Sequence, residues 1–274
     1  MMRGRACWQE LHSPEVPAVE VREVRVYKDS VPILDGVSFA LSLGEALAVV
    51  GPNGAGKTTL LSLIAGLSRP TLGEVRIFGH PPGRHVCLGY LPQRSEAEWN
   101  FPATVLDVVL MGRVGQVGLF RPLTSLDRKK AEEALKRVGL EHLAARRVRE
   151  LSGGEQKRML IARALAQEAR ILLLDEPLTA LDAVAQESLL SLLKDLAGQG
   201  LSIIVAMHEL DLVAKYFPRV LLLRTRPIAL GDPKEVLTPE ALRAAYGTAL
   251  HLLSSAMGTL AVGDICCPKD EPSS

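Results

Sequence analysis

Residues 46–58 read ALAVVGPNGAGKT, and this stretch decides the fold class. Its apolar beginning, Ala46–Val50, is typical of a short strand covered on both faces of a parallel sheet. The rest fits the pattern G-x-x-x-x-G-K-[ST], in which glycines let backbone N–H groups close on phosphate oxygens at the start of a helix. Lys57 is placed to reach the β- and γ-phosphates, and the Thr58 hydroxyl is placed to ligate Mg²⁺. We therefore predict a strand, a phosphate-binding loop and a helix, in that order.

Further short apolar runs recur downstream between helical patterns. They are Ile171–Leu174, Ile203–Ala206 and Val220–Leu223. Buried strands that alternate with helices are typical of an α/β protein with a parallel sheet. We therefore predict a P-loop ATPase core built on such a sheet.

The segments around these runs have other patterns. Val37, Phe39, Leu41 and Leu43 alternate with smaller residues, which predicts an antiparallel N-terminal β-subdomain. Residues from about 95 to 167 combine helical periodicity with many charges, and we interpret them as an inserted helical subdomain. The expected boundaries are an N-terminal extension over 1–18, a main domain over 19–247 and a C-terminal extension over 248–274, whose end we expect to be disordered.

The composition excludes several classes of protein. The chain has 274 residues, 47% of them hydrophobic, and 32 Lys and Arg against 31 Asp and Glu give a formal net charge of +1. A dedicated nucleic-acid-binding protein would need a basic surplus to neutralise phosphates, so we expect no nucleic-acid partner. No window reaches the ~18 apolar residues of a membrane span, and no signal peptide precedes the core, so we expect a cytoplasmic protein. The cysteines, Cys7, Cys87, Cys266 and Cys267, are too scattered for a disulfide framework or a zinc site.

Two acids follow the apolar run Ile171–Leu174. The carboxyl ends of parallel strands are where ligands bind in such sheets. Asp175 is placed to hold Mg²⁺ through water, and Glu176 is placed to polarise an attacking water. The alternative is a solvated strand end, which the phosphate-loop motif upstream disfavours.

The stretch Leu151–Glu155 reads LSGGE and precedes a strong helical pattern. Ser152, Gly153 and Gly154 can form an anion-binding helix N-terminus. Taken alone, the stretch favours an ordinary helix cap with a flexible hinge.

Together these motifs resemble the ATP-binding subunit of ABC transporters. The resemblance runs in order from about Val19 to Gly247, and LSGGE departs from the commoner family signature only by Glu155 in place of Gln. It implies that ATP and Mg²⁺ are the cofactors and that ATP is hydrolysed. The residues that it places around the nucleotide and its metal are Tyr27, Gly51, Pro52, Asn53, Gly54, Ala55, Gly56, Lys57, Thr58, Thr59, Gln93, Ser152, Gly153, Gly154, Asp175, Glu176, Asp182 and His208.

The resemblance also implies individual roles. Tyr27 would stack on adenine, Gln93 would sense Mg²⁺ and the attacking water, and His208 would contact the γ-phosphate. Asp182 would communicate across a head-to-tail pair of subunits. In that pair, Ser152, Gly153 and Gly154 would serve the ATP of the partner subunit.

The sequences of the insertion and of a segment downstream of it resemble those of ATP-binding subunits of bacterial zinc and manganese importers, sometimes of iron. The matching stretches are Glu98–Arg113, Gly118–Pro122, Thr238–Glu240 and Ala245–Gly247. Trp99 and Phe101 are expected either to anchor a partner or to close the subdomain core. The pair Cys266–Cys267 is either incidental or a thiol site for a metal.

The implied partners are a second copy of the chain, a polytopic membrane permease and, indirectly, an extracytoplasmic metal-binding protein. The implied location is the cytoplasmic face of the cell membrane, as a peripheral subunit. One alternative is an importer ATPase for an iron chelate or vitamin B12. Another is a non-transport ABC ATPase acting on nucleic acid or ribosomes, which the single cassette and the balanced charge disfavour.

Overall fold

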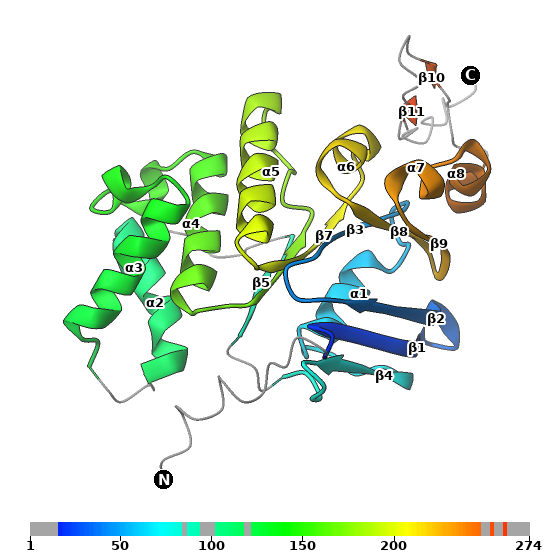
Figure 1. Ribbon diagram of the computed structural model, residues 1–274, viewed down its shortest axis with the longest axis horizontal. Helices are drawn as coiled ribbons and strands as arrows, with labels where there is room; N and C mark the ends of the chain where they lie inside the picture. The colour runs from blue at the N-terminus through cyan, green and yellow to red at the C-terminus, as the bar shows by residue number, and fades with distance from the viewer. Residues whose placement is uncertain are drawn as a thin grey trace, which may run out of the picture.

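The computed structural model describes residues 16–83, 87–93, 102–117, 122–247, 253–254 and 260–261. Its largest sheet has six strands in the order β5-β6-β7-β3-β8-β9 (Figure 1). Their bounds are β3 (Ala46–Val50), β5 (Leu88–Leu91), β6 (Ile171–Asp175), β7 (Ser202–Met207), β8 (Arg219–Arg224) and β9 (Arg226–Gly231). Neighbours from β5 to β8 pair in parallel, which confirms the predicted parallel core, whereas β9 pairs antiparallel with β8.

The edge strands β5 and β9 do not follow from the apolar pattern of the sequence. The inner strands β3, β6 and β7 are buried over their whole length. By contrast, β9 alternates exposed and half-buried residues and includes Pro227, and β5 is only four residues long and includes Gly89. Edge strands tolerate proline and bury less surface, so their apolar signal is weak.

A second sheet, in the order β2-β1-β4, forms the N-terminal part and is antiparallel, as predicted. Its strands are β1 (Val19–Lys28), β2 (Val31–Leu41) and β4 (Leu72–Ile77). Of the alternating residues, Val37, Phe39 and Leu41 are buried, but Leu43 is 38% exposed. The alternation stops there because the chain turns after Leu41 to enter β3.

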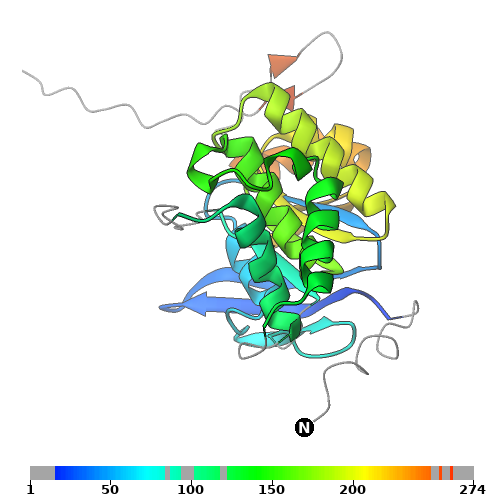
Figure 2. The ribbon, with the colours of Figure 1, turned by 90° about the vertical axis from the view of Figure 1, so that its left-hand side faces the viewer.

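The helices fall into two groups. The first group comprises α1 (Lys57–Ile64), α5 (Ala183–Gly198), α6 (Leu210–Tyr216), α7 (Pro233–Val236) and α8 (Pro239–Tyr246). The others are α2 (Val105–Val117), α3 (Ser125–Arg137) and α4 (Gly153–Ala166), with 3₁₀ turns at η1 (Glu141–Leu143) and η2 (Val148–Glu150). Figure 1 shows α2, α3 and α4 gathered at one end of the molecule, and Figure 2 views the molecule from that end.

Strand β3 lies between two apolar clusters. Ala48 and Val50 face the cluster shared with α2, α3, α4 and α5, whereas Leu47 and Val49 face the cluster shared with α1 and the N-terminal sheet. A strand buried on both sides in this way holds the start of the phosphate-loop motif at a fixed place. Within the described ranges, no helix is long and apolar enough to cross a membrane.

Several sequence predictions lie outside the described residues. They concern Trp99, Phe101, the stretch 118–121 and the pair Cys266–Cys267. Of the C-terminal extension, only β10 (Leu253–Ser254) and β11 (Leu260–Ala261) are described, and they pair with each other. The domain boundaries stay predictions.

Candidate functional site

The phosphate-loop motif joins β3 to α1, as the sequence predicts. Gly56 precedes the helix with φ +98, and a Cβ atom there would lie 2.5 Å from Leu34 Cδ2. Gly51 is equally confined, because a Cβ atom there would lie 2.0 Å from the carbonyl oxygen of Leu223. Only glycine fits either position. Helix α1 has no side-chain cap and no acidic residue in its first turn, so its N-terminus keeps its positive partial charge for an anion.

Lys57, the first residue of α1, turns back over this loop. Its side chain is 6% exposed, and its Nζ atom donates to the carbonyl oxygens of Gly51 at 2.7 Å and Pro52 at 3.2 Å. The same Nζ atom lies 3.9 Å from Glu176 Oε1. The ammonium group therefore lies at the centre of the loop, within reach of the acids that follow β6.

Asp175, the last residue of β6, is 1% exposed. Neither of its carboxylate oxygens has a partner of regular hydrogen-bond geometry among the described residues. Burial raises the pKa of Asp175, while the nearby hydroxyl of Thr58 and, more weakly, the charge of Lys57 act to lower it. A buried carboxylate beside a hydroxyl, with its lone pairs unused, is the kind of oxygen ligand that a small divalent cation prefers.

Glu176 has the left-handed backbone angle φ 47, which is rare for a residue other than glycine. Its backbone N–H donates to the carbonyl oxygen of Ala206 on β7 at 2.9 Å. Such angles cost about 1–3 kcal/mol and concentrate at functional sites. The turn directs the Glu176 side chain, which is 14% exposed, to the carboxyl edge of the main sheet.

Gln93 contacts Glu176 directly. The Gln93 Nε2 atom donates to Glu176 Oε2 at 2.5 Å. The reason is sheet register: Leu91 of β5 pairs with Leu174 of β6, so the residues two positions further along each chain meet just beyond the sheet. Lys57, Glu176 and Gln93 thus form one chain of contacts, with Asp175 at its base.

The LSGGE stretch lies apart from that cluster. Ser152 caps α4 in a capping box with Glu155: Ser152 N–H donates to Glu155 Oε2 at 2.7 Å, and Glu155 N–H donates to Ser152 Oγ at 3.3 Å. The hydrogen bond from the Ser152 backbone lowers the pKa of Glu155. Ser152 is therefore a helix cap, and no hydrogen bond or ion pair described for it reaches the phosphate loop.

Asp182 caps α5 by accepting from the Ala185 N–H at 2.8 Å. Its helix lies beside the LSGGE stretch. A Cβ atom on Gly153 would lie 3.4 Å from Leu181 Cδ2, and one on Gly154 would lie 3.5 Å from Ala185 Cβ. The structure therefore brings Asp182 next to the signature residues and not next to Lys57.

His208 and Tyr27 are the remaining predicted residues. His208 follows β7 with its side chain 50% exposed, and its Nε2 atom lies 3.3 Å from Glu209 Oε1. Sequence reasoning missed Glu209, although its position directly after the histidine was a signal. Tyr27 lies on β1, is 40% exposed and is free of the buried cluster, as a stacking surface must be.

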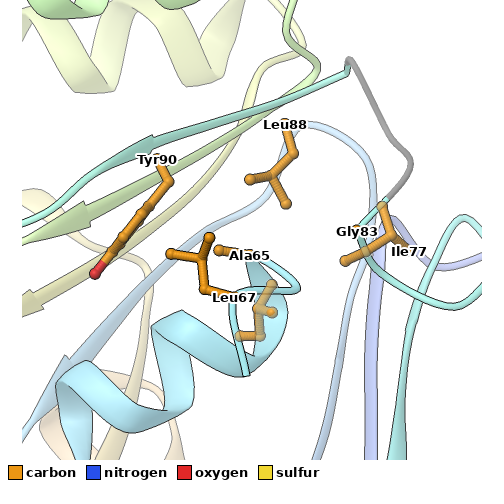
Figure 3. Close-up of a pocket in the computed structure, with 7 residues that line it drawn as sticks. Ala65, Leu67, Ile77, Gly83, Leu88 and Tyr90 are labelled. Carbon is orange, nitrogen blue, oxygen red and sulfur yellow. The ribbon is translucent and has the colours of Figure 1, made fainter. Parts of the chain in front are cut away.

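A small cavity of about 180 Å³ lies beside the end of α1 (Figure 3). Its lining is mostly apolar and comprises Ile64, Ala65, Leu67, Ile77, Gly83, Leu88 and Tyr90. None of these is a predicted site residue. In the part of the chain that the structure describes, no group of three or more His, Cys, Asp or Glu side chains is arranged to hold a metal ion.

Comparison with known proteins gives consistent matches. The family described as "ABC transporter" matches residues 34–179. The zinc transport system ATP-binding protein TroB of Treponema pallidum is 42% identical over 231 residues, covering 84% of this chain and 87% of that protein. The manganese transport system ATP-binding protein MntB of Bacillus subtilis is 39% identical, covering 86% and 94% respectively. A solved inward-facing ABC transporter, described as of the metal-chelate type, has a TM-score of 0.76 and 36% identity and covers 84% of this chain and 89% of that chain.

Proposed function

The chain belongs to the ABC transporter family as an ATP-hydrolysing subunit, and from this premise we propose that it powers the uptake of zinc or manganese ions across a membrane. The observation that supports this choice of cargo is the extent of the match. ATP-binding proteins of zinc and manganese transport systems are about 40% identical to this chain over most of its length. The cluster of Lys57, Gln93 and Glu176 supplies the chemistry.

Phosphoryl transfer to water depends mainly on positioning and on neutralising charge. We assign the phosphate contacts to the backbone of residues 51–59 and to Lys57. The Lys57 ammonium now donates to two loop carbonyls, and phosphate oxygens can replace these carbonyls as acceptors. Tyr27, exposed on β1, would stack on the adenine.

The site also fits a magnesium ion. The two unpartnered oxygens of the buried Asp175 and the neighbouring Thr58 hydroxyl are suitable ligands or holders of its water shell. Gln93 uses its amide nitrogen to contact Glu176, which leaves the amide oxygen for the ion. When bound, Mg²⁺ would offset the negative charge of the β- and γ-phosphates.

We assign the attacking water to Glu176. Its carboxylate is confined between Gln93 and Lys57, and its strained backbone holds it at the sheet edge, which is the geometry needed to orient a water or accept its proton. His208 would contact the γ-phosphate. Glu209, 3.3 Å from its Nε2 atom, would hold the imidazole in place.

The working unit would be a head-to-tail pair of chains. The placement of Gly153 and Gly154 beside Leu181 and Ala185 supports this arrangement, since Ser152, Gly153 and Gly154 would then face the ATP of the partner subunit. Asp182, next to them, would couple the two sites. The pair would sit at the cytoplasmic face of the membrane beneath a polytopic permease, which an extracytoplasmic metal-binding protein would supply.

A second candidate is the uptake of a metal chelate. The observation that favours it is the 36% identity to the solved transporter described as of the metal-chelate type. The ATP chemistry of this chain would be the same in both cases, because the cargo contacts other subunits.

Elemental analysis of cells in metal-poor medium tests the proposed cargo. Cells with the wild-type chain are compared with cells carrying Glu176→Gln for their content of zinc, manganese and iron. We expect the variant to lose zinc or manganese alone. A loss of iron alone would favour the chelate, and no change in any metal would contradict metal uptake.

A further inference from the structure

The phosphate loop is backed by the turn between β8 and β9, which lies beside α1 and β2 (Figure 1). The backbone N–H of Thr225, at this turn, donates to the carbonyl oxygen of Ala55 at 3.0 Å. The carbonyl oxygen of Thr225 accepts from the backbone N–H of Asp35 on β2 at 2.8 Å. Thr225 therefore connects the centre of the loop to the N-terminal sheet.

The bond to Ala55 fixes a donor of the loop. In a planar trans peptide the C=O and the following N–H point in opposite directions. Because the Ala55 carbonyl points to Thr225, the N–H of Gly56 points away from Thr225, to the opposite side of the loop. Gly56 lies close against β2, since a Cβ atom there would be 2.8 Å from the carbonyl oxygen of Ile33 and 2.5 Å from Leu34 Cδ2.

The backbone conformation of Thr225 is intrinsically unfavourable, so other contacts must hold the turn. Thr225 has φ 57, an unfavourable angle for a β-branched residue. Its neighbour Arg226 fixes the turn from outside: Arg226 Nε and Nη2 lie 2.7 and 2.6 Å from Asp35 Oδ2. Arg25 Nε lies 3.3 Å from Asp35 Oδ1, and the Asp35 side chain is only 14% exposed between the two arginines.

We propose that Asp35 and Arg226 are positioning residues for nucleotide binding, which act through Thr225 to orient the Gly56 N–H toward the phosphates. The inference rests on the proposed function of the loop. It predicts a kinetic signature: a backbone donor that contacts the phosphate throughout the reaction contributes to binding, and its disorder raises KM without lowering kcat.

The sign of the effect separates positioning from simple charge. Asp35 carries a negative charge, and if it acted only through its field, its removal would strengthen the binding of an anion such as ATP. If Asp35 positions the turn, its removal weakens ATP binding. The two mechanisms thus predict opposite shifts for Asp35→Asn.

The test uses purified full-length protein and Mg-ATP, with Kd from calorimetry and KM and kcat from phosphate release. We expect Asp35→Asn and Arg226→Gln each to raise Kd and KM about threefold to tenfold, with kcat within about twofold of wild type. Arg226→Lys, which keeps the charge, should recover most of the loss. Arg226 is 73% exposed, so its variants should fold even if Asp35→Asn does not.

The matched control is Glu74→Gln. Glu74 on β4 of the same sheet also lies between two arginines, with Arg22 Nη1 at 3.2 Å and Arg76 Nη2 at 3.0 Å, but its described contacts do not lead to the loop. It should bind ATP as wild type does. Wild-type affinity in both Asp35→Asn and Arg226→Gln would overturn this inference alone, as would tighter binding by Asp35→Asn. Failure of the wild-type chain to bind ATP would overturn the proposed function with it.

Discussion

Lys57 and Glu176 carry opposite charges 3.9 Å apart, and both are largely shielded from solvent. Lys57 also donates to the carbonyls of Gly51 and Pro52. In this arrangement the ammonium occupies the centre of the loop at the start of α1. The oxygens of an incoming phosphate can then accept hydrogen bonds from this ammonium in place of the two carbonyls. No additional positive charge has to be buried, because the ammonium is already there.

Replacement of Lys57 by alanine tests this role. We expect Lys57→Ala to weaken ATP binding about tenfold or more, because a charge-assisted contact to phosphate is lost. Calorimetric titration with Mg-ATP measures the effect. Lys215→Ala is the control, since this exposed lysine pairs with Glu187 at 2.7 Å on another face. Equal affinities of Lys57→Ala and the control would refute the phosphate-loop assignment.

At the residue scale, the sequence was informative where a motif fixes spacing. Lys57, Asp175 and Glu176 are each predicted as site residues from a short pattern that consists of one strand and the turn after it. The contact between Gln93 and Glu176 depends on β5 lying next to β6, which no local pattern states. Asp35 and Arg226 are 191 positions apart and meet only in the folded chain, so sequence reasoning could not pair them.

At the scale of elements, α3 begins with a buried polar network. Asp127 accepts from the backbone N–H and hydroxyl of Thr124 at 3.0 and 2.7 Å, and Arg113 Nε of α2 donates to its other oxygen at 3.0 Å. Arg113 also donates to the Ala166 carbonyl oxygen at the end of α4 at 2.7 Å. Three helices are thus joined at two buried side chains. The hydrogen bonds from Thr124, with help from Arg113, lower the pKa of Asp127 to about 2.

We expect Asp127→Asn to lower the free energy of unfolding at neutral pH by about 2 kcal/mol, since it leaves the buried Arg113 guanidinium with the exposed Glu168, 2.9 Å from its Nη1 atom, as its remaining charge partner. The lowered pKa gives the pH dependence. The stabilisation is complete above the ordinary value of 3.8 and is lost as the pH falls toward about 2. Denaturant unfolding at several pH values measures the difference between wild type and variant.

Asp107→Asn provides the matched control. Asp107 caps α2 through Thr104 in the same way, with Thr104 N–H and hydroxyl at 2.9 and 2.6 Å, but it is exposed and has no buried arginine. Its replacement should cost about 1 kcal/mol or less. Equal losses of unfolding free energy in the two variants would show that the contact between Asp127 and Arg113 adds no stability.

In the main sheet, the strands that the sequence predicts are those buried over all or most of their length. The strands β3, β6, β7 and β8 each contain a continuous apolar run, whereas β4, β5 and β9 alternate or are short and escape the pattern. Ser152 shows a different limit. Taken alone, its stretch favours a helix cap, and the nucleotide contact follows only from the family resemblance. The structure of a single chain shows the cap.

At the scale of the whole molecule, the predicted site residues fall into two separate groups. Lys57, Gln93, Asp175 and Glu176 gather at the carboxyl edge of the main sheet, whereas the signature residues pack beside the start of α5. We propose that the two groups complete each other's site in a head-to-tail pair of chains. ATP would then bind between the chains, and its hydrolysis would release them, which gives a membrane partner two states to follow.

We propose that this pair hydrolyses ATP with Glu176 acting on the water. Phosphate release from Mg-ATP by purified Glu176→Gln tests it most directly, with Glu187→Gln as the control for loss of an exposed, lysine-paired carboxylate. We predict that Glu176→Gln binds ATP as wild type does but releases phosphate more than about tenfold more slowly, while the control keeps its rate. Phosphate release by Glu176→Gln at the wild-type rate would contradict the account.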